Sequence, residues 1–149
     1  MARFLTDADY DTLIKEEIKR LLDGRATNGT GTPYKLVKAE NMAIRQIKNR
    51  LKARYDMEAE FAKSNTPTDL RDSFLVMITI DITLYHLYSQ TGHRDVPKHR
   101  EDRYQDAIDW LKDVGTGVQE ADFATYEEEG ETPPPDMRLS SDEQENHSW

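Results

Sequence analysis

The stretch FLVMITIDITLYHLY, residues 74–88, is the most apolar run in the chain and predicts the central helix of the fold. Within a predicted helix over 69–90, apolar residues share one side at helical spacing: Leu70, Phe74, Met77, Ile78, Leu84, Tyr85 and Tyr88. Ile80 and Leu87 lie off that side, so we expect neighbours to cover this helix on more than one side. The run is shorter than the roughly 20 apolar residues that cross a bilayer, and it contains Asp81.

Asp81 falls among the apolar positions of this predicted helix. A buried carboxylate needs a charged or hydrogen-bonding partner, and Arg100, Arg103 or a basic residue of 35–54 could supply it. The alternative is a general acid or base with a raised pKa. We favour the structural pair, because no second catalytic group in the sequence completes a site.

Two helices are predicted before the apolar one. The first starts at Thr6, where Asp9 three residues later resembles a capping box, and its buried stripe comprises Leu13, Ile14, Ile18, Leu21 and Leu22. The second covers 38–62 and carries apolar residues at helical spacing. The apolar helix follows, with Thr68 or Asp69 as its cap.

The last predicted helix is VPKHREDRYQDAIDWLKDVGTG, residues 96–117. Pro97 suits its first turn, and Gly115 and Gly117 suit its exit, where the chain turns left-handed. Strand signals are nearly absent. The sequence therefore predicts an all-α domain over 1–117, a small bundle of about four helices.

Charge is distributed unevenly along the chain. The net charge is −9, and residues 118–149 hold ten Asp or Glu against Arg138 alone, so the predicted bundle is neutral. This segment, 118–149, is rich in Pro and acidic residues and cannot form a core. We expect an extended acidic tail that docks on a neighbouring chain, by its side chains or by adding a strand to a sheet edge.

No motif for catalysis, metal or cofactor binding emerges from the sequence. The chain has no cysteine, and His86, His93, His99 and His147 show no metal-ligand spacing. The Gly- and Thr-rich segment 23–33 lacks the Lys-Ser/Thr of a phosphate loop. We expect a protein that is not an enzyme, binds no cofactor and is made in a reducing cytoplasm.

One segment, 35–54, is basic, with seven Lys or Arg against Glu40. Three uses remain open: a solvated face, a surface for an acidic partner such as a neighbour's tail, or contact with nucleic-acid phosphates. Exposed aromatics near helix seams are plausible interface anchors. The interface candidates are Lys48, Arg50, Lys52, Arg54, Arg100, Arg103, Trp110, Phe123, Tyr126 and Trp149.

Three stretches, in this order and spacing, resemble one family. They are AENMAIRQIKNRLKARYD (39–56), DLRDSFLVMITIDITLYHLYS (69–89) and the 96–117 helix, preceded by FLTDADYDTLI (4–14). The set resembles the Mu-like phage head–tail connector proteins over roughly 4–117. Each stretch alone is generic for helices, whereas the ordered set is fairly specific.

The resemblance implies an α-helical adaptor without enzymatic activity or cofactor. Its partners would be copies of itself in a closed ring of about twelve, the portal protein, and a tail or stopper protein. DNA would pass through the lumen without specific binding, and no membrane is involved. The protein would be made in the bacterial cytoplasm and reside in the virion neck. Two alternatives remain: a nucleic-acid-binding regulator that uses the basic segment, and a head or tail assembly chaperone.

Overall fold

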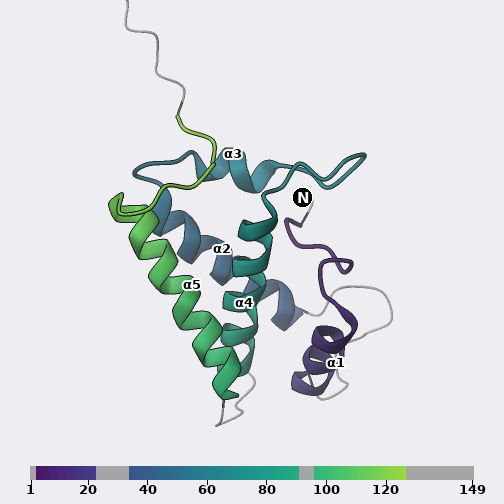
Figure 1. Ribbon diagram of the computed structural model, residues 1–149. Helices are drawn as coiled ribbons and strands as arrows, with labels where there is room; N and C mark the ends of the chain where they lie inside the picture. Colours follow the sequence, from purple (N-terminus) through teal and green to yellow (C-terminus); the bar gives the residue numbers. More distant parts are fainter. Residues whose placement is uncertain (1–2, 23–33, 91–95, 127–149) are drawn as a thin grey trace, which may run out of the picture.

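The computed structural model describes residues 3–22, 34–90 and 96–126, which form five helices and no strand. The helices are α1 (Thr12–Leu21), α2 (Tyr34–Leu51), α3 (Met57–Ala62), α4 (Ser73–Gln90) and α5 (Lys98–Thr116). In Figure 1, α4 stands between α5 and α1, with α2 behind it and α3 across one end. The predicted all-α class is confirmed, with five helices in the described residues instead of about four.

The additional helix arises because the predicted second helix, 38–62, is broken after Leu51. The chain turns over 52–56, and the Asp56 carboxylate caps α3 by accepting a hydrogen bond of 3.1 Å from the Ala59 N–H. Apolar spacing continues through the break, since Leu51 and Tyr55 are both buried. Periodicity therefore gave no sign of the turn, while Asp56 was the available signal.

The expectation that α4 forms the centre is confirmed. It packs mainly against α2 and α5, and ten of its residues are buried, including Leu75, Ile82, Leu84 and Leu87. The buried hydroxyls of Thr79 and Thr83 donate to carbonyls one turn earlier, so they need no external partner. The predicted apolar side was wrong at Leu70, Phe74 and Met77, which are 66%, 40% and 40% exposed.

The start of α1 also differs from the prediction. The Asp9 carboxylate does accept hydrogen bonds from the Thr6 N–H and hydroxyl, but these close a turn, and α1 begins at Thr12 with Asp11 as its cap. Asp9 also forms an ion pair with Arg71, so its carboxylate binds outside α1. Leu13, predicted to be buried, is 82% exposed because α1 presents Ile18 and Leu21 to the core instead.

Arg71 fixes the N-terminal segment to the entry of α4. Its five N–H groups donate to the carboxylates of Asp9 and Asp69 and to the Phe4 carbonyl, at 2.6–2.9 Å. Asp69 therefore serves this cluster, and the cap of α4 is Asp72, which accepts from the Leu75 N–H. All donors of the buried guanidinium are satisfied, as a buried charge requires.

The C-terminal ends of α2 and α5 approach closely at Gly115. A Cβ there would lie 2.8 Å from the Arg50 carbonyl oxygen, so a side chain is excluded. Gly117, as predicted, takes the left-handed conformation that ends α5, with φ of 84°. The chain then returns over the helices, where Phe123 is buried and Ala124 pairs with Asp56 and Glu60. The folded body thus extends to 126, past the predicted boundary at 117.

Replacing Gly115 by alanine should lower the free energy of unfolding by about 1–3 kcal/mol, because the methyl group must displace the Arg50 backbone. Urea denaturation measures the change. Lys112→Ala, an exposed position on the same helix, is the control and should stay within about 0.5 kcal/mol of the parent. Equal stability of G115A and the parent would rule out this close helix approach.

The Arg71 cluster should make stability depend on pH. Hydrogen bonds from Arg71 lower the pKa of Asp69 to about 2 from its ordinary 3.8. With the folded-state pKa lowered, the stabilisation is present above the ordinary value and is lost as pH falls from about 4 to about 2. Asp69→Asn should flatten the fall of the urea midpoint across that window, whereas Asp122→Asn, at an exposed carboxylate, should leave it unchanged. Equal slopes for D69N and the parent would contradict the assignment.

Candidate interaction surfaces

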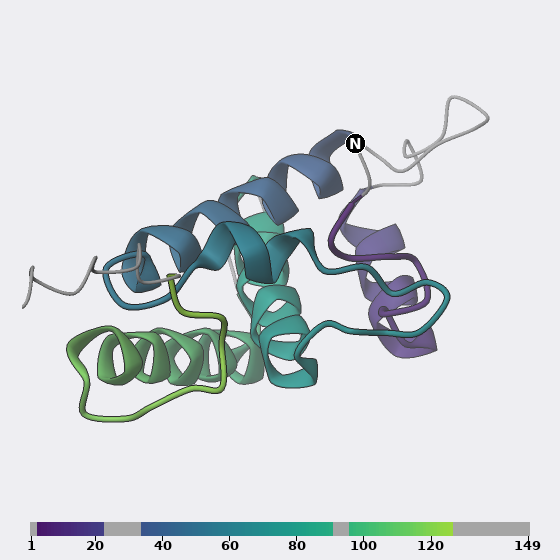
Figure 2. The same ribbon diagram turned by 90° about the horizontal axis from the view of Figure 1, so that it is seen from above.

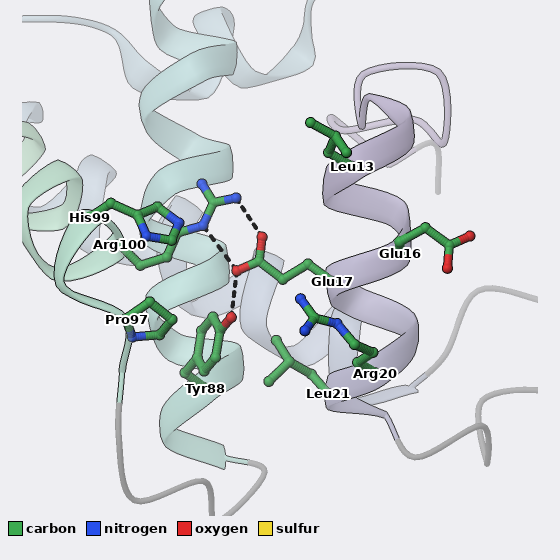
Figure 3. Close-up of a pocket in the computed structure, with 9 residues that line it drawn as sticks. All are labelled: Leu13, Glu16, Glu17, Arg20, Leu21, Tyr88, Pro97, His99 and Arg100. Carbon is green, nitrogen blue, oxygen red and sulfur yellow. Dashed lines mark hydrogen bonds and ion pairs between the residues drawn. The ribbon is translucent and has the colours of Figure 1, made fainter.

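A hollow of about 690 Å³ lies between α1, the end of α4 and the start of α5. Glu17 reaches from α1 toward Arg100 and Tyr88, while Glu16, at the edge of the hollow, points away from these two residues (Figure 3). Arg100 donates two hydrogen bonds to the Glu17 carboxylate, from Nε at 3.0 Å and from Nη2 at 2.5 Å. The Tyr88 hydroxyl donates a third, so three helices meet at one carboxylate. We call this hollow the Glu17 hollow.

Asp81 links this network to Arg103, whose side chain is half-exposed. Its carboxylate is buried and accepts a hydrogen bond of 2.7 Å from Arg103 Nε, while Arg100 Nη1 lies 4.0 Å away. The two arginines that the sequence offered as partners are thus the ones the fold brings to it. Basic side chains of 35–54 do not contribute to this cluster in the described residues.

Hydrogen bonds within the network stabilise the charged forms of Glu17 and Arg103. Burial alone would raise the pKa of Glu17, but the hydrogen bonds from Arg100 and Tyr88 outweigh it and the net pKa is lowered. Burial and the hydrogen bond to Glu17 raise the pKa of Tyr88 to about 12. The hydrogen bond to Asp81 raises the pKa of Arg103. A carboxylate with a lowered pKa is a poor general acid, so this network suits a structural role.

A second surface, which we call the apolar groove, is lined by residues of α4, of α5 and of α1 with the turn before it. None of its lining residues comes from α2, which lies behind α4 in Figure 1. It has a volume of about 450 Å³ and runs between α1 and the Asp81 network. Its apolar lining comprises Leu13, Ile14, Val76, Met77 and Ile80, and its polar lining comprises Asp9, Asp11, Ser73, Asp81, Arg100 and Arg103. Leu70 and Phe74, just before and at the start of α4, are also exposed apolar side chains. Exposed apolar surface of this kind is typical of interaction sites.

A third surface, which we call the α2 face, is the side of α2 turned away from α4. Its exposed residues are Tyr34, Lys35, Lys38, Met42, Arg45 and Lys52, the last just beyond the helix end. None of these four cations pairs with an acidic side chain in the described part of the chain. Glu40, the one acidic residue of α2, is buried against Arg3 and Tyr10. The α2 face is therefore uniformly positive.

The structure distributes the other interface candidates differently. Lys48 pairs with Glu58 at 2.7 Å, Arg50 is exposed, and Arg54 donates to the Val114 carbonyl at 2.6 Å. These contacts leave Arg50 available to a partner while Lys48 and Arg54 have partners within the chain.

Two aromatic candidates serve the chain's own packing. Phe123 is buried, because its ring packs edge-on against Tyr55 and Trp110, and so it is not available to a partner. Trp110 is half-buried between Phe123 and Phe74. Tyr126 is 53% exposed and donates its hydroxyl to the Lys52 carbonyl. Trp149 lies outside the described residues, as does most of the predicted tail.

Histidines and acidic residues do not form a metal site where the structure is described. No group of three His, Cys, Asp or Glu side chains there is placed to hold an ion. His86 bonds to Gln46 at 2.8 Å, and burial lowers its pKa, while His99 lines the Glu17 hollow. His93 and His147 fall outside the described residues. None of the described helices combines the length and apolar character needed to cross a membrane.

Sequence reasoning did not single out Glu17, Glu40 or Arg71. A signal existed for the first two: Glu17 follows Ile14 by three residues and precedes Leu21 by four, and Glu40 follows Leu36 by four. Both carboxylates thus fall within apolar helical stripes, as Asp81 does. Arg71 precedes its helix, where periodicity carries no information.

Replacing Glu17 by alanine should cost about 3 kcal/mol of unfolding free energy, because Arg100 loses its bidentate partner in a buried place. Glu16→Ala, at the adjacent exposed carboxylate that points away from Arg100, is the control and should change stability by less than about 0.5 kcal/mol. Thermal or urea denaturation measures both. Similar losses in the two variants would show that the Glu17 network does not hold α1.

Comparison with known proteins identifies the family. The model of the family described as Bacteriophage Mu, Gp36 matches residues 6–138, which covers all five helices and part of the acidic segment. No curated protein and no solved structure matches the chain. The match spans far more than half of the sequence and agrees with the resemblance to Mu-like phage proteins. The chain belongs to the bacteriophage Mu Gp36 family, and is a phage structural or morphogenesis protein.

Proposed function

We propose that the protein is a head–tail connector, an adaptor whose copies form a ring in the phage neck between the portal and the tail components. Family membership supports a role in the phage particle or its assembly. The observation that carries the proposal is the pair of unlike surfaces on different sides of the subunit. The apolar groove is lined by α4, α5 and the α1 region. α2 runs along another side of α4 (Figure 2), and the α2 face is turned away from α4.

Two unlike surfaces suit a head-to-tail contact. A contact in which one surface of a subunit meets a different surface of the next generates a ring when the rotation closes. The groove presents exposed apolar side chains beside three acidic residues, Asp9, Asp11 and Asp81, and two arginines, Arg100 and Arg103. The α2 face presents Met42 and Tyr34 among cations. The charges would set register, and the apolar side chains would supply most of the attraction.

The remaining features of the proposal derive from a ring in the neck. The ring would match the portal in symmetry, carry the tail or a stopper below, and let DNA pass through the lumen without sequence recognition. No cofactor or enzymatic step is required. The protein would be made in the bacterial cytoplasm and end in the virion.

A second function, nucleic-acid binding, is favoured by one observation, the uniform positive charge of the α2 face. Such binding would be sensitive to salt, because cations that contact phosphates release counterions. A monomer or dimer that binds duplex DNA at moderate salt and ignores the portal would support this function over the connector.

Native mass of the purified protein, alone and mixed with the portal protein of the same phage, tests the connector. We expect a ring alone or one that forms on the portal. Met77→Glu places a charge in the apolar groove and should reduce ring formation at least tenfold, a loss of about 1.4 kcal/mol per contact.

Val118→Glu adds the same charge at another exposed apolar position, 78% exposed and outside the groove, and should assemble like the parent. Circular dichroism of both variants separates lost assembly from lost folding. A subunit that stays monomeric with the portal, or a folded M77E that assembles like the parent, would contradict the proposal.

A further inference from the structure

We propose that the α2 face binds the chain's own acidic C-terminal segment, residues 127–149, within the same molecule. This inference does not depend on the connector function. It rests on the charges of the face, on the place where the described chain ends, and on the length of the acidic segment beyond that point.

The charges of the two elements are complementary. Along the α2 face, Lys38, Arg45 and Lys52 are spaced by seven residues and share one side of the helix, and their side chains have no acidic partner in the described residues. The segment 127–149 holds eight Asp or Glu against Arg138. Four of the eight, Glu127, Glu128, Glu129 and Glu131, come first.

The described chain ends beside this face. The Tyr126 hydroxyl donates to the Lys52 carbonyl, and the Asp56 N–H donates to the Ala124 carbonyl. Glu127 therefore comes directly after a residue bound at the C-terminal end of the face. Tyr126 is held at the C-terminal end of α2, so the segment starts next to Lys52.

The length of the segment is sufficient. α2 has 18 residues and is about 27 Å long. The segment 127–149 spans up to about 75 Å when extended, at about 3.3 Å per residue. Fewer than half of its residues are enough to run the whole face, so Met137 and Leu139 can also reach the exposed Met42 and Tyr34.

Tethering favours the same molecule over a second copy. Exposed ion pairs are individually weak, so a separate acidic peptide would bind the face poorly. A short connection to Tyr126 instead supplies an effective concentration on the order of millimolar.

Paramagnetic broadening in the full-length protein tests this. The chain has no cysteine, so Ser141→Cys carries a single spin label. We expect the label to broaden the backbone amide signals of Lys38, Arg45 and Lys52 more than those of Lys15 and Lys112, which lie on other helices. The broadening should disappear in about 1 M salt, where the Debye length is about 3 Å.

Charge reversal provides the matched comparison. Lys38→Glu, Arg45→Glu and Lys52→Glu together should abolish the broadening of α2. The control combines Lys15→Glu, Lys19→Glu and Lys112→Glu, which make the same change in net charge at exposed positions on α1 and α5, and it should keep the broadening. Amide spectra of both triple variants show whether the fold is retained.

Three outcomes would overturn the proposal. One is the absence of broadening along α2 in the spin-labelled protein. Another is strong broadening in a mixture of spin-labelled molecules without isotope and isotope-enriched molecules without a label, since that assigns the segment to a second copy. The third is duplex DNA that binds through Lys38 and Arg45 equally well before and after Glu127, Glu128, Glu129 and Glu131 are changed to Gln, because a segment that covers the face must compete with DNA.

Discussion

The fold depends on one constraint, an α4 that is apolar on most of its circumference in a chain that is otherwise strongly hydrophilic. Such a helix is stable in water only when neighbours cover it from several directions. α2 and α5 do most of this covering, and α3 closes one end (Figure 1). The close approach at Gly115 arises from the same need, because α2 and α5 must converge to cover α4 together. Among the described helices, the side of α4 between α1 and α5 stays partly uncovered.

α1 and the N-terminal segment are positioned by ion pairs as well as by apolar burial. Glu17 binds Arg100, Asp9 binds Arg71, and Glu40 binds Arg3, and each pair joins elements far apart in the sequence. Buried ion pairs add little net stability, because the charges must first lose water, but they penalise any arrangement that leaves them unpaired. These pairs therefore fix the place of α1, whose contact with α4 is otherwise small.

The same arrangement explains the surfaces that carry the proposed function. The ion pair of Glu17 with Arg100 joins α1 to α5, and the apolar groove lies between α1 and α4, where Met77 and Leu13 are exposed. α2 buries its apolar stripe against α4 and consequently turns its cations outward as one uniform face. A connector ring and a face covered by an acidic segment are compatible, because displacement of the segment would free the face during assembly.

Sequence alone determined that the chain is helical, that 74–88 forms its centre, that Asp81 needs a basic partner, and which phage family it resembles. These features are local, since they depend on residue spacing and on the cost of burying one charge. Tertiary structure decided where the second predicted helix breaks, that Phe123 packs inward, and that Leu70, Phe74 and Met77 stay exposed. It also decided that Arg71 anchors the N-terminal segment, which no spacing indicates. The physical reason is that periodicity shows which residues of one helix share a side, whereas the choice of buried side depends on neighbours that the fold brings from elsewhere.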